Sequence, residues 1–420
     1  MNKLYIILII TFASLNAQAQ QPDYNPYSPV DFSTKDWTYA AHAFYNNHNN
    51  SNSLSNEFSK AYNNSEYLSK ELKDQQMSQL GESVKVGRVY RGGLGAWFKS
   101  RKEQNSPFFY VGVDFQEVLD GQVDKDFVGL VLYGNKHYAG QQVDISNTEY
   151  TNDYFNRVKF GMGKAFGNGE IVHTLSAVLG LTIGQNHDYL KVNNAGLFTQ
   201  EDGDYIDVSI QAETKLADTV WGSLFTVNGL GASADLHYSM YKEKDFFLAI
   251  NFQNLGFVNW NGGPFTATAD TSFRFDGLAN DSTNQEQIPN DFSKSGLRNL
   301  IFKNPGHSSF TKGLPLNINF TAGKYFSDGK FYIGINTDFY PSLISTYRAE
   351  LFGTWNIQEK YQITPIVSYS SFGQMNIGLA LGAQLWDSVS IRMGSSYLNS
   401  MFNPNANAAQ GGFISLVFFH

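Results

Sequence analysis

The chain has 420 residues, a formal net charge of −8 and an isoelectric point near 5.5. This acidic balance argues against a nucleic-acid partner, which would require a basic face. Because the sequence contains no cysteine, it excludes disulfides, thiol nucleophiles, thiolate metal sites and a lipid-modified N-terminal cysteine.

The N-terminus has the three parts of a secretory signal peptide over residues 1–19. Lys3 supplies the positive charge, residues 4–13 form the apolar core, and Ala17-Gln18-Ala19 provides the small-x-small pattern before cleavage at Gln20. A membrane anchor is the alternative, but this apolar core is too short to span a hydrocarbon layer that requires about twenty residues. We therefore expect an exported mature chain.

Residues 20–81 are predicted to form a polar segment with amphipathic helices, either in the periplasm or as a plug. Its first half is rich in asparagine, apart from residues 36–45, which are compatible with a short strand. A helical period of apolar residues follows over 53–80. Asn63 with Glu66 resembles a capping box, which predicts the start of a second helix.

From residue 82 to 420 the apolar period changes to two, which is typical of half-buried strands. Examples are the alternating runs at 109–115, 171–183, 246–252, 331–335 and 414–418. The pattern predicts an all-β protein, an antiparallel up-and-down transmembrane β-barrel of about 14–16 strands. An N-terminal helical segment and a helix-bearing loop, with the helix at 289–303, would complete it.

The residues between the apolar positions are polar or small, so they are predicted to face the barrel lumen. The charged and titratable lumen candidates are Asp114, Arg157, Lys159, Asp207, Glu213, Asp235, His237, Asp338, Arg348, Glu350 and Arg392. In an open pore these groups would set the field of the channel. In a blocked barrel they would form salt bridges between the walls, and the sequence leaves both possibilities open.

The predicted connections fall into a short and a long class. Short turns are expected at 167–169, 328–329, 357–360 and 387–388, and longer links at 135–152, 185–204, 276–313, 341–345 and 399–410. Outer-membrane barrels combine short periplasmic turns with long outer loops. Aromatic residues also collect at strand ends, as an interfacial girdle requires.

The hairpin at 375–393 raises the question of whether the apolar face of the strands points inward or outward. Met375, Ile377 and Leu381 alternate with small or polar residues, and the second arm repeats the pattern after Asp387-Ser388. A soluble sandwich would bury the apolar face, whereas a membrane barrel would turn it to lipid. Only 16% of the residues are charged, below the roughly 25% of soluble domains. This low charge, together with the loops, girdle and signal peptide, favours the barrel.

No catalytic, cofactor or metal site is predicted. His237 and Asp235 share the polar face of one strand, but alternate residues lie about 6.6–6.8 Å apart, too far for a direct triad with Ser233 or Ser239. The other histidines are placed in loops, in the N-terminal segment or at the membrane interface: His42, His48, His137, His173, His187 and His307. No phosphate-binding loop, HExxH or EF-hand spacing is present, and Asp202-Gly203-Asp204 is at best a weak surface cation site.

Several runs resemble a family of uncharacterised outer-membrane proteins of Bacteroidota, listed as a domain of unknown function. They are LPLNINFTAGKYFSDGKFYIGINTDFY, STYRAELFGTWNI, SYSSFGQMNIGLALGAQL, FNRVKFGMGKAF and NLGFVNWN. The resemblance implies an outer-membrane barrel but no established activity. More distantly, the architecture is similar to hydrophobic-compound transporters with an N-terminal hatch and to barrels of type IX secretion and gliding.

The function expected from the sequence is an outer-membrane barrel that acts in transport or as a structural component of the envelope. Its partners would be outer-membrane lipid, the assembly machinery that reads the aromatic terminal strand, and envelope proteins. A hydrophobic-compound channel is one alternative, with an inner apolar patch from residues 127–133 and 255–260. The others are a subunit of a secretion or gliding complex and a soluble exported β protein.

Overall fold

The computed structural model describes residues 38–99, 106–167, 170–217, 226–275, 302, 306–327, 329–341, 347–358, 360–371, 374–386 and 388–419. The predicted signal peptide and almost all of the predicted helix at 289–303 lie outside these residues. None of the described helices is both long and apolar enough to cross a membrane.

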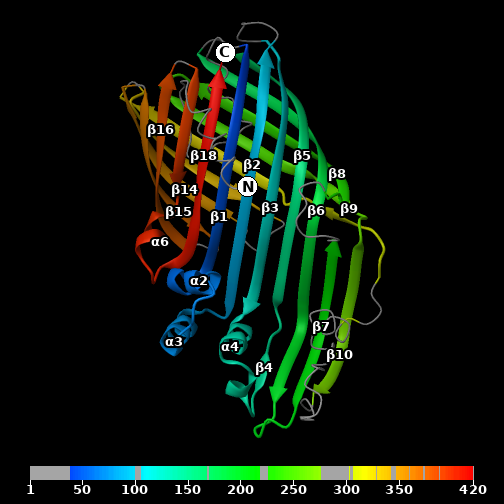
Figure 1. The fold of residues 1–420 in the computed structure, drawn as a ribbon. Helices are drawn as coiled ribbons and strands as arrows, with labels where there is room; N and C mark the ends of the chain where they lie inside the picture. Colours follow the sequence, from blue (N-terminus) through cyan, green and yellow to red (C-terminus); the bar gives the residue numbers. More distant parts are fainter. Residues whose placement is uncertain are drawn as a thin grey trace, which may run out of the picture.

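Fourteen of the described strands form one closed antiparallel barrel, in the predicted fold class (Figure 1). In chain order they are β1 (Tyr39–Ser55), β2 (Ser83–Lys99), β3 (Phe108–Asp124), β5 (Thr148–Gly167), β6 (Ile171–Thr199), β8 (Gly229–Lys242), β9 (Phe246–Trp260), β12 (Asn317–Phe326), β13 (Phe331–Phe339), β14 (Tyr347–Ile357), β15 (Tyr361–Ser370), β16 (Gln374–Trp386), β17 (Val389–Ser395) and β18 (Asn407–Phe419). Pairing of β18 with β1 closes the ring. Closure satisfies the backbone groups that an open edge would expose.

The alternation of the strands turns their apolar residues outward. On β6, Leu175, Leu179 and Leu181 are exposed, while the intervening Ser176 and Thr182 are buried. The hairpin of β16 and β17 follows the same rule, because Met375 and Ile377 are exposed whereas Asn376 is buried. A water-soluble protein rarely exposes such a continuous apolar surface. The outer surface therefore matches a lipid environment.

The two ends of the barrel differ in their connections. Two residues separate β16 from β17, and three separate β5 from β6, β8 from β9 and β14 from β15, all at the end where the C-terminus lies (Figure 1). At the other end, five of the seven links carry helices or further strands, whereas seven residues join β13 to β14 and three join β15 to β16. The predicted division into short and long links is thus present with two exceptions, the eight-residue link between β2 and β3 at the C-terminal end and the three-residue link between β15 and β16 at the other end.

Exposed aromatic residues mark both edges of the apolar surface. Phe326, Trp355, Tyr361 and Trp386 lie at the short-turn ends of their strands, and Phe339, Tyr347 and Tyr369 at the opposite ends. Along β15, Tyr361 and Tyr369 are eight positions apart, roughly 26 Å at the rise of a strand. The nine residues from Tyr361 to Tyr369 fall within the about 9–11 residues that a tilted transmembrane strand needs.

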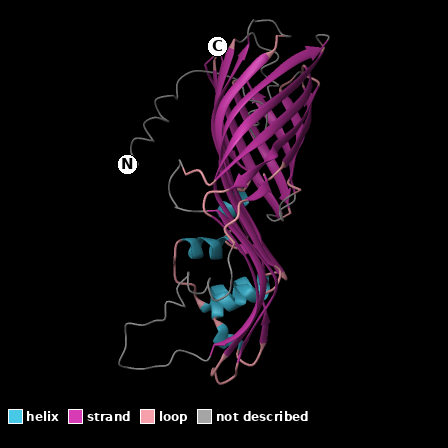
Figure 2. Ribbon diagram, turned by 90° about the vertical axis from the view of Figure 1, so that its right-hand side faces the viewer, coloured by secondary structure: helices cyan, strands magenta, loops and turns pink. Residues whose placement is uncertain are grey.

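One wall of the barrel continues far beyond the other as an extension of the sheet (Figures 1 and 2). The 29-residue β6 is roughly 95 Å long. Its residues 171–184 pair with β8 as part of the barrel wall, whereas residues 187–199 pair with β7 beyond the barrel. The extension also contains β4 (Gln142–Asp144), β7 (Ile206–Ala217) and β10 (Pro264–Phe275). The predicted loop at 185–204 is therefore wrong, since most of it continues β6.

Three helices lie against one side of this extension (Figure 2): α2 (Asn56–Asn63), α3 (Lys70–Gln79) and α4 (Lys125–Tyr133). The two predicted helices within 53–80 are confirmed, with serine caps at Ser55 and Ser69. The predicted capping box at Asn63 is wrong, because the second helix begins later. Residues 127–133 were expected to supply an apolar patch in the lumen, but they belong to α4, outside the barrel.

A hydrogen bond links α4 to α3 through Tyr133 and Asp74. The phenol donates to Asp74 Oδ1 over 2.5 Å. Burial, together with this bond, raises the pKa of Tyr133 to about 12. The phenol consequently remains a donor at all physiological pH values.

Gln76 fixes α3 to the end of β1. Its fully buried side chain accepts from the Ser55 backbone N–H over 2.8 Å and donates to the Ser53 carbonyl over 2.9 Å. In Gln76→Ala both backbone groups lose a partner, at about 1–3 kcal/mol each. We expect faster amide hydrogen exchange at Ser55 and throughout α3, with exchange in β14 unchanged.

The neighbouring Gln75→Ala is the matched control, since Gln75 is exposed and bonds only to Asn405 over 3.0 Å. Equal exchange rates in the two variants would show that Gln76 does not hold α3 in place.

The barrel begins earlier than predicted. Residues 39–55 form β1, which pairs with both β2 and β18. The expectation that the barrel starts at residue 82, after a wholly separate N-terminal segment, is therefore wrong. Because β1 carries many Asn and Ser residues on its inner face, its composition resembles that of a polar linker.

Candidate functional site

The barrel interior is the candidate site, because the structure gathers polar and charged residues there. All nine candidates that lie on barrel strands are at most 8% exposed: Asp114, Arg157, Lys159, Asp235, His237, Asp338, Arg348, Glu350 and Arg392. The other two, Asp207 and Glu213, lie on β7 in the extension and are partly exposed. They do not face the interior of the barrel, because β7 pairs only with the part of β6 outside the ring and with β10.

Four of these residues form a central ion cluster: Asp114, Arg157, Lys159 and Asp235. Arg157 donates to both carboxylate oxygens of Asp114, over 2.7 and 2.8 Å. Lys159 Nζ lies 2.9 Å from Asp114 and 2.6 Å from Asp235. Two positive and two negative groups thus neutralise each other away from water, where an unpaired charge would be very costly.

Asn254 extends this cluster across the interior from β9. The chain has a register shift here and Asn254 adopts a φ of 65°, as expected of a bulge. Its backbone N–H donates to Asp235 over 2.7 Å, and its side chain contacts Arg157 and the Pro315 carbonyl. The bulge thereby ties β3, β5, β8 and β9 to one another.

A belt of amide side chains begins beside this cluster and runs along the inner wall from β8 to β14. Asn251 Oδ1 on β9 accepts from His237 Nδ1 over 2.5 Å, and the Asn251 amide nitrogen donates to Asn319 over 2.9 Å. Asn319 donates to Asn336 over 2.9 Å, and Asn336 to Glu350 over 3.3 Å. Each residue bonds to one on the next strand, so the belt joins β8, β9, β12, β13 and β14.

The belt ends in a second buried ion pair. Arg348 donates to Glu350 over 2.6 Å and contacts His48 Nε2 over 2.8 Å. His48 lies on β1, five positions away in the ring, so this contact crosses the interior. The other nitrogen of His48 lies 3.0 Å from the Tyr397 hydroxyl. Together with the Arg91–Gln253 bond of 2.5 Å between β2 and β9, this contact links distant walls.

Apolar side chains also fill part of the interior. Phe247, Tyr325, Tyr332, Phe352 and Ile366 belong to one buried cluster, and their strands place it toward the short-turn end. A second buried cluster includes Trp97, Phe108 and Tyr110 on β2 and β3. Arg392 lies over the ring of Phe413, with 5.8 Å to its centre.

The histidines make structural contacts rather than a triad. His237 pairs with Asn251, while Asp235 is bonded to Lys159 and Asn254. His42 and His48, predicted in the N-terminal segment, and His187, predicted in a loop, are buried on barrel strands. No cluster of metal-ligating residues occurs among the described positions.

The His187–Asp153 pair was missed by sequence reasoning. His187 Nδ1 lies 2.7 Å from Asp153, which also accepts from Lys312 over 2.7 Å. The His187 ring stacks on Trp260 at 5.4 Å between centres. A register shift between Tyr154 and Phe155, opposite Gln185, reverses the inward parity of β6. No simple count of alternating residues would have revealed this reversal.

A closed antiparallel barrel with an apolar outer surface, aromatic edges and a buried polar interior defines a transmembrane β-barrel protein. The chain belongs to the "Family of unknown function (DUF5723)", whose model matches residues 40–389.

The chain is similar in fold to several solved structures. No curated protein matches this chain. Among solved structures, the chain is similar to the TodX deltaS2S3 mutant monoaromatic hydrocarbon channel, at 7% identity and TM-score 0.46, covering 94% of this chain and 92% of that one. The Pseudomonas putida toluene transporter TodX has 8% identity and TM-score 0.43, and a Pseudomonas aeruginosa FadL homologue 9% and 0.37, each with 94% and 92% coverage.

Proposed function

We propose that this protein is an integral outer-membrane barrel whose closed interior anchors a large extension on the outer side of the membrane. The observation that carries this proposal is the bonding of distant inner walls, through Arg348 with His48 and Arg91 with Gln253. Since these contacts replace water by protein partners, they support a structural barrel rather than a wide aqueous pore.

The direction of insertion follows from the two ends. Short turns are periplasmic and long loops are external in outer-membrane barrels. The extension lies at the long-link end, which supports a position outside the cell. The terminal strand β18 completes the ring by pairing with β1, and its aromatic end is the expected signal for the assembly machinery. Outer-membrane lipid would cover the apolar surface.

Single-channel recording in planar lipid bilayers tests the closed interior. We expect the purified wild-type protein to give no stable current steps. In a variant with Asp114, Arg157, Lys159 and Asp235 all replaced by serine, the interior loses bulk and no charge of the cluster is left without its partner. This variant should conduct ions. Stable steps from the wild type, at a level unchanged in the serine variant, would contradict the proposal.

A second candidate is a channel for small hydrophobic compounds. The buried aromatic cluster around Tyr325 and Tyr332 favours it, because an apolar ligand needs an apolar path. The described part of the predicted N-terminal hatch, from residue 38 onward, does not support that role, since β1 is a barrel strand and α2 and α3 pack on β1. Uptake of a labelled alkane or aromatic compound into vesicles with and without the protein separates this role from that of an anchor.

A further inference from the structure

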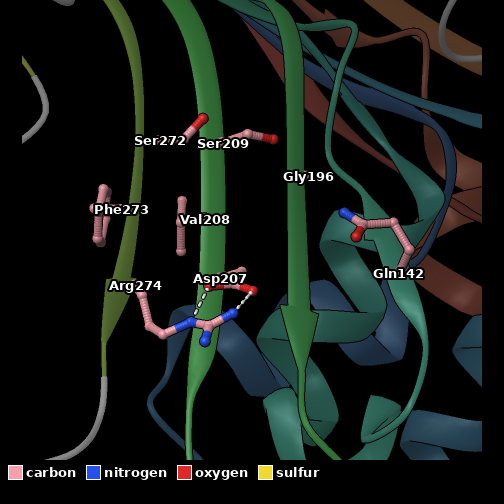
Figure 3. Close-up of a pocket in the computed structure, with 8 residues that line it drawn as sticks. All are labelled: Gln142, Gly196, Asp207, Val208, Ser209, Ser272, Phe273 and Arg274. Atoms are coloured by element: carbon pink, nitrogen blue, oxygen red, sulfur yellow. Dashed lines mark hydrogen bonds and ion pairs between the residues drawn. The ribbon is translucent and has the colours of Figure 1, made fainter.

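The extension carries a walled pocket that neither the barrel closure nor the membrane anchor uses (Figure 3). Its volume is about 380 Å³, and it is lined by Gln142, Gly196, Asp207, Val208, Ser209, Ser272, Phe273 and Arg274. This volume lies within the range of about 300–1,000 Å³ found for small-molecule sites.

The register of three strands creates the hollow. Gly196 on β6 pairs with Ser209 on β7, which pairs with Ser272 on β10, so three small residues stand side by side. The next row on one side contains Gln211 and Asp270, which are hydrogen-bonded over 3.2 Å. Residues two positions apart on a strand share a face about 6.6–6.8 Å apart. The row of short side chains at Gly196, Ser209 and Ser272 therefore lies between two rows of longer side chains.

The other wall is an ion pair. Arg274 donates to both oxygens of Asp207 over 2.7 Å each, as the dashed lines in Figure 3 show. The guanidinium also lies over the Tyr205 ring, 3.7 Å from its centre, and Phe198 is in ring contact with Tyr205 at 6.3 Å. Because each charge has its counterpart, this wall carries no net charge, while the first wall holds the carboxylate of Asp270, hydrogen-bonded to the neutral Gln211.

Three polar side-chain groups that line the pocket have no hydrogen-bond partner within the described part of the chain. They are the amide of Gln142 and the hydroxyls of Ser209 and Ser272. A Cβ built on Gly196 would lie 2.3 Å from Gln142 Nε2 and 3.5 Å from Ser209 Oγ, so the glycine lets the Gln142 amide lie close over β6, beside the Ser209 hydroxyl. Amides and hydroxyls both donate and accept hydrogen bonds.

We propose that this pocket binds a neutral saccharide unit. A neutral ligand rich in hydroxyl groups could hydrogen-bond to the amide and the serine hydroxyls, which both donate and accept. The ion pair of one wall has no net charge, and aromatic rings lie at that edge of the pocket. The inference rests on the proposed function in that an extension outside the cell would meet surface glycans. The binding itself does not depend on which side of the membrane the extension occupies.

The full-length protein in detergent, applied to an array of neutral and acidic glycans, tests this proposal. We expect binding to neutral glycans, followed by measurable heats with maltose or cellobiose in titration calorimetry. The variant Ser209→Val with Ser272→Val should bind at least tenfold more weakly, because valine suits a strand but cannot hydrogen-bond. The control Thr268→Val changes an exposed hydroxyl on the same face of β10 outside the pocket and should leave binding unchanged.

Absence of binding to neutral glycans, preference for acidic ones, or equal binding by the double valine variant would overturn the proposal. Bilayer currents report on the barrel alone. A failure of the closed-barrel proposal would therefore remain distinguishable from a failure of saccharide binding.

Discussion

Replacing Asp114 with alanine should destabilise the barrel by about 3–5 kcal/mol, the usual cost of removing one partner from a buried ion pair. Arg157 and Lys159 would then lose the carboxylate that they share, while both positive charges stay buried. Urea unfolding of the protein in lipid vesicles, followed by tryptophan fluorescence, measures this change in free energy.

The exposed ion pair of the extension provides the control. Asp207 and Arg274 share the same bidentate geometry, but their side chains are 42% and 51% exposed. Asp207→Ala should therefore cost at most about 1 kcal/mol. An equally small effect of Asp114→Ala would show that the central ion cluster does not hold the walls together. Replacement of all four cluster residues by apolar ones of similar volume should restore most of the stability.

Replacing Leu179 with arginine should cost about 2–4 kcal/mol, the effect of a cation at the middle of the lipid-facing surface of a barrel. Leu179 is 67% exposed and lies near the middle of the part of β6 that pairs with β8. Heat-modifiable gel mobility and urea unfolding in vesicles both measure the loss.

Val131→Arg is the matched control, because Val131 is 59% exposed but lies on α4, away from the barrel. There the arginine would meet water and should have little effect. If the two variants were equally stable, the apolar surface would not face lipid, and the soluble alternative would regain support.

Alternating patterns predicted the barrel strands well wherever one face meets lipid and the other the interior. The hairpin of β16 and β17 is an example, since lipid demands apolar side chains at Met375 and Ile377, while Asn376 and Arg392 are buried inside. The same reasoning identified the residues of the central ion cluster as inward-facing. Their pairing was not predictable, because Lys159 and Asp235 are 76 positions apart in the chain.

The strand predictions were wrong where a strand continues beyond the apolar surface that faces lipid. The second half of β6 and the lower part of β1 carry polar residues on both faces, so their composition resembles that of loops. Hydrogen bonding to neighbouring strands keeps them extended. The reverse error occurred at residues 127–133, where a run that is apolar on both faces folds as α4, whose N-terminus is capped by the side chain of Asp124.

The amino-acid sequence by itself determined that the chain would form a barrel with an apolar outer surface, since a period of two is a local property of each strand. Tertiary structure decided which inward residues meet, because closure brings β1 beside β18 and sets His48 against Arg348 across 300 positions. It also decided that three small residues on β6, β7 and β10 would stand in one row and form a pocket. Register between strands, and the bulges that shift it, depend on contacts that no single strand encodes.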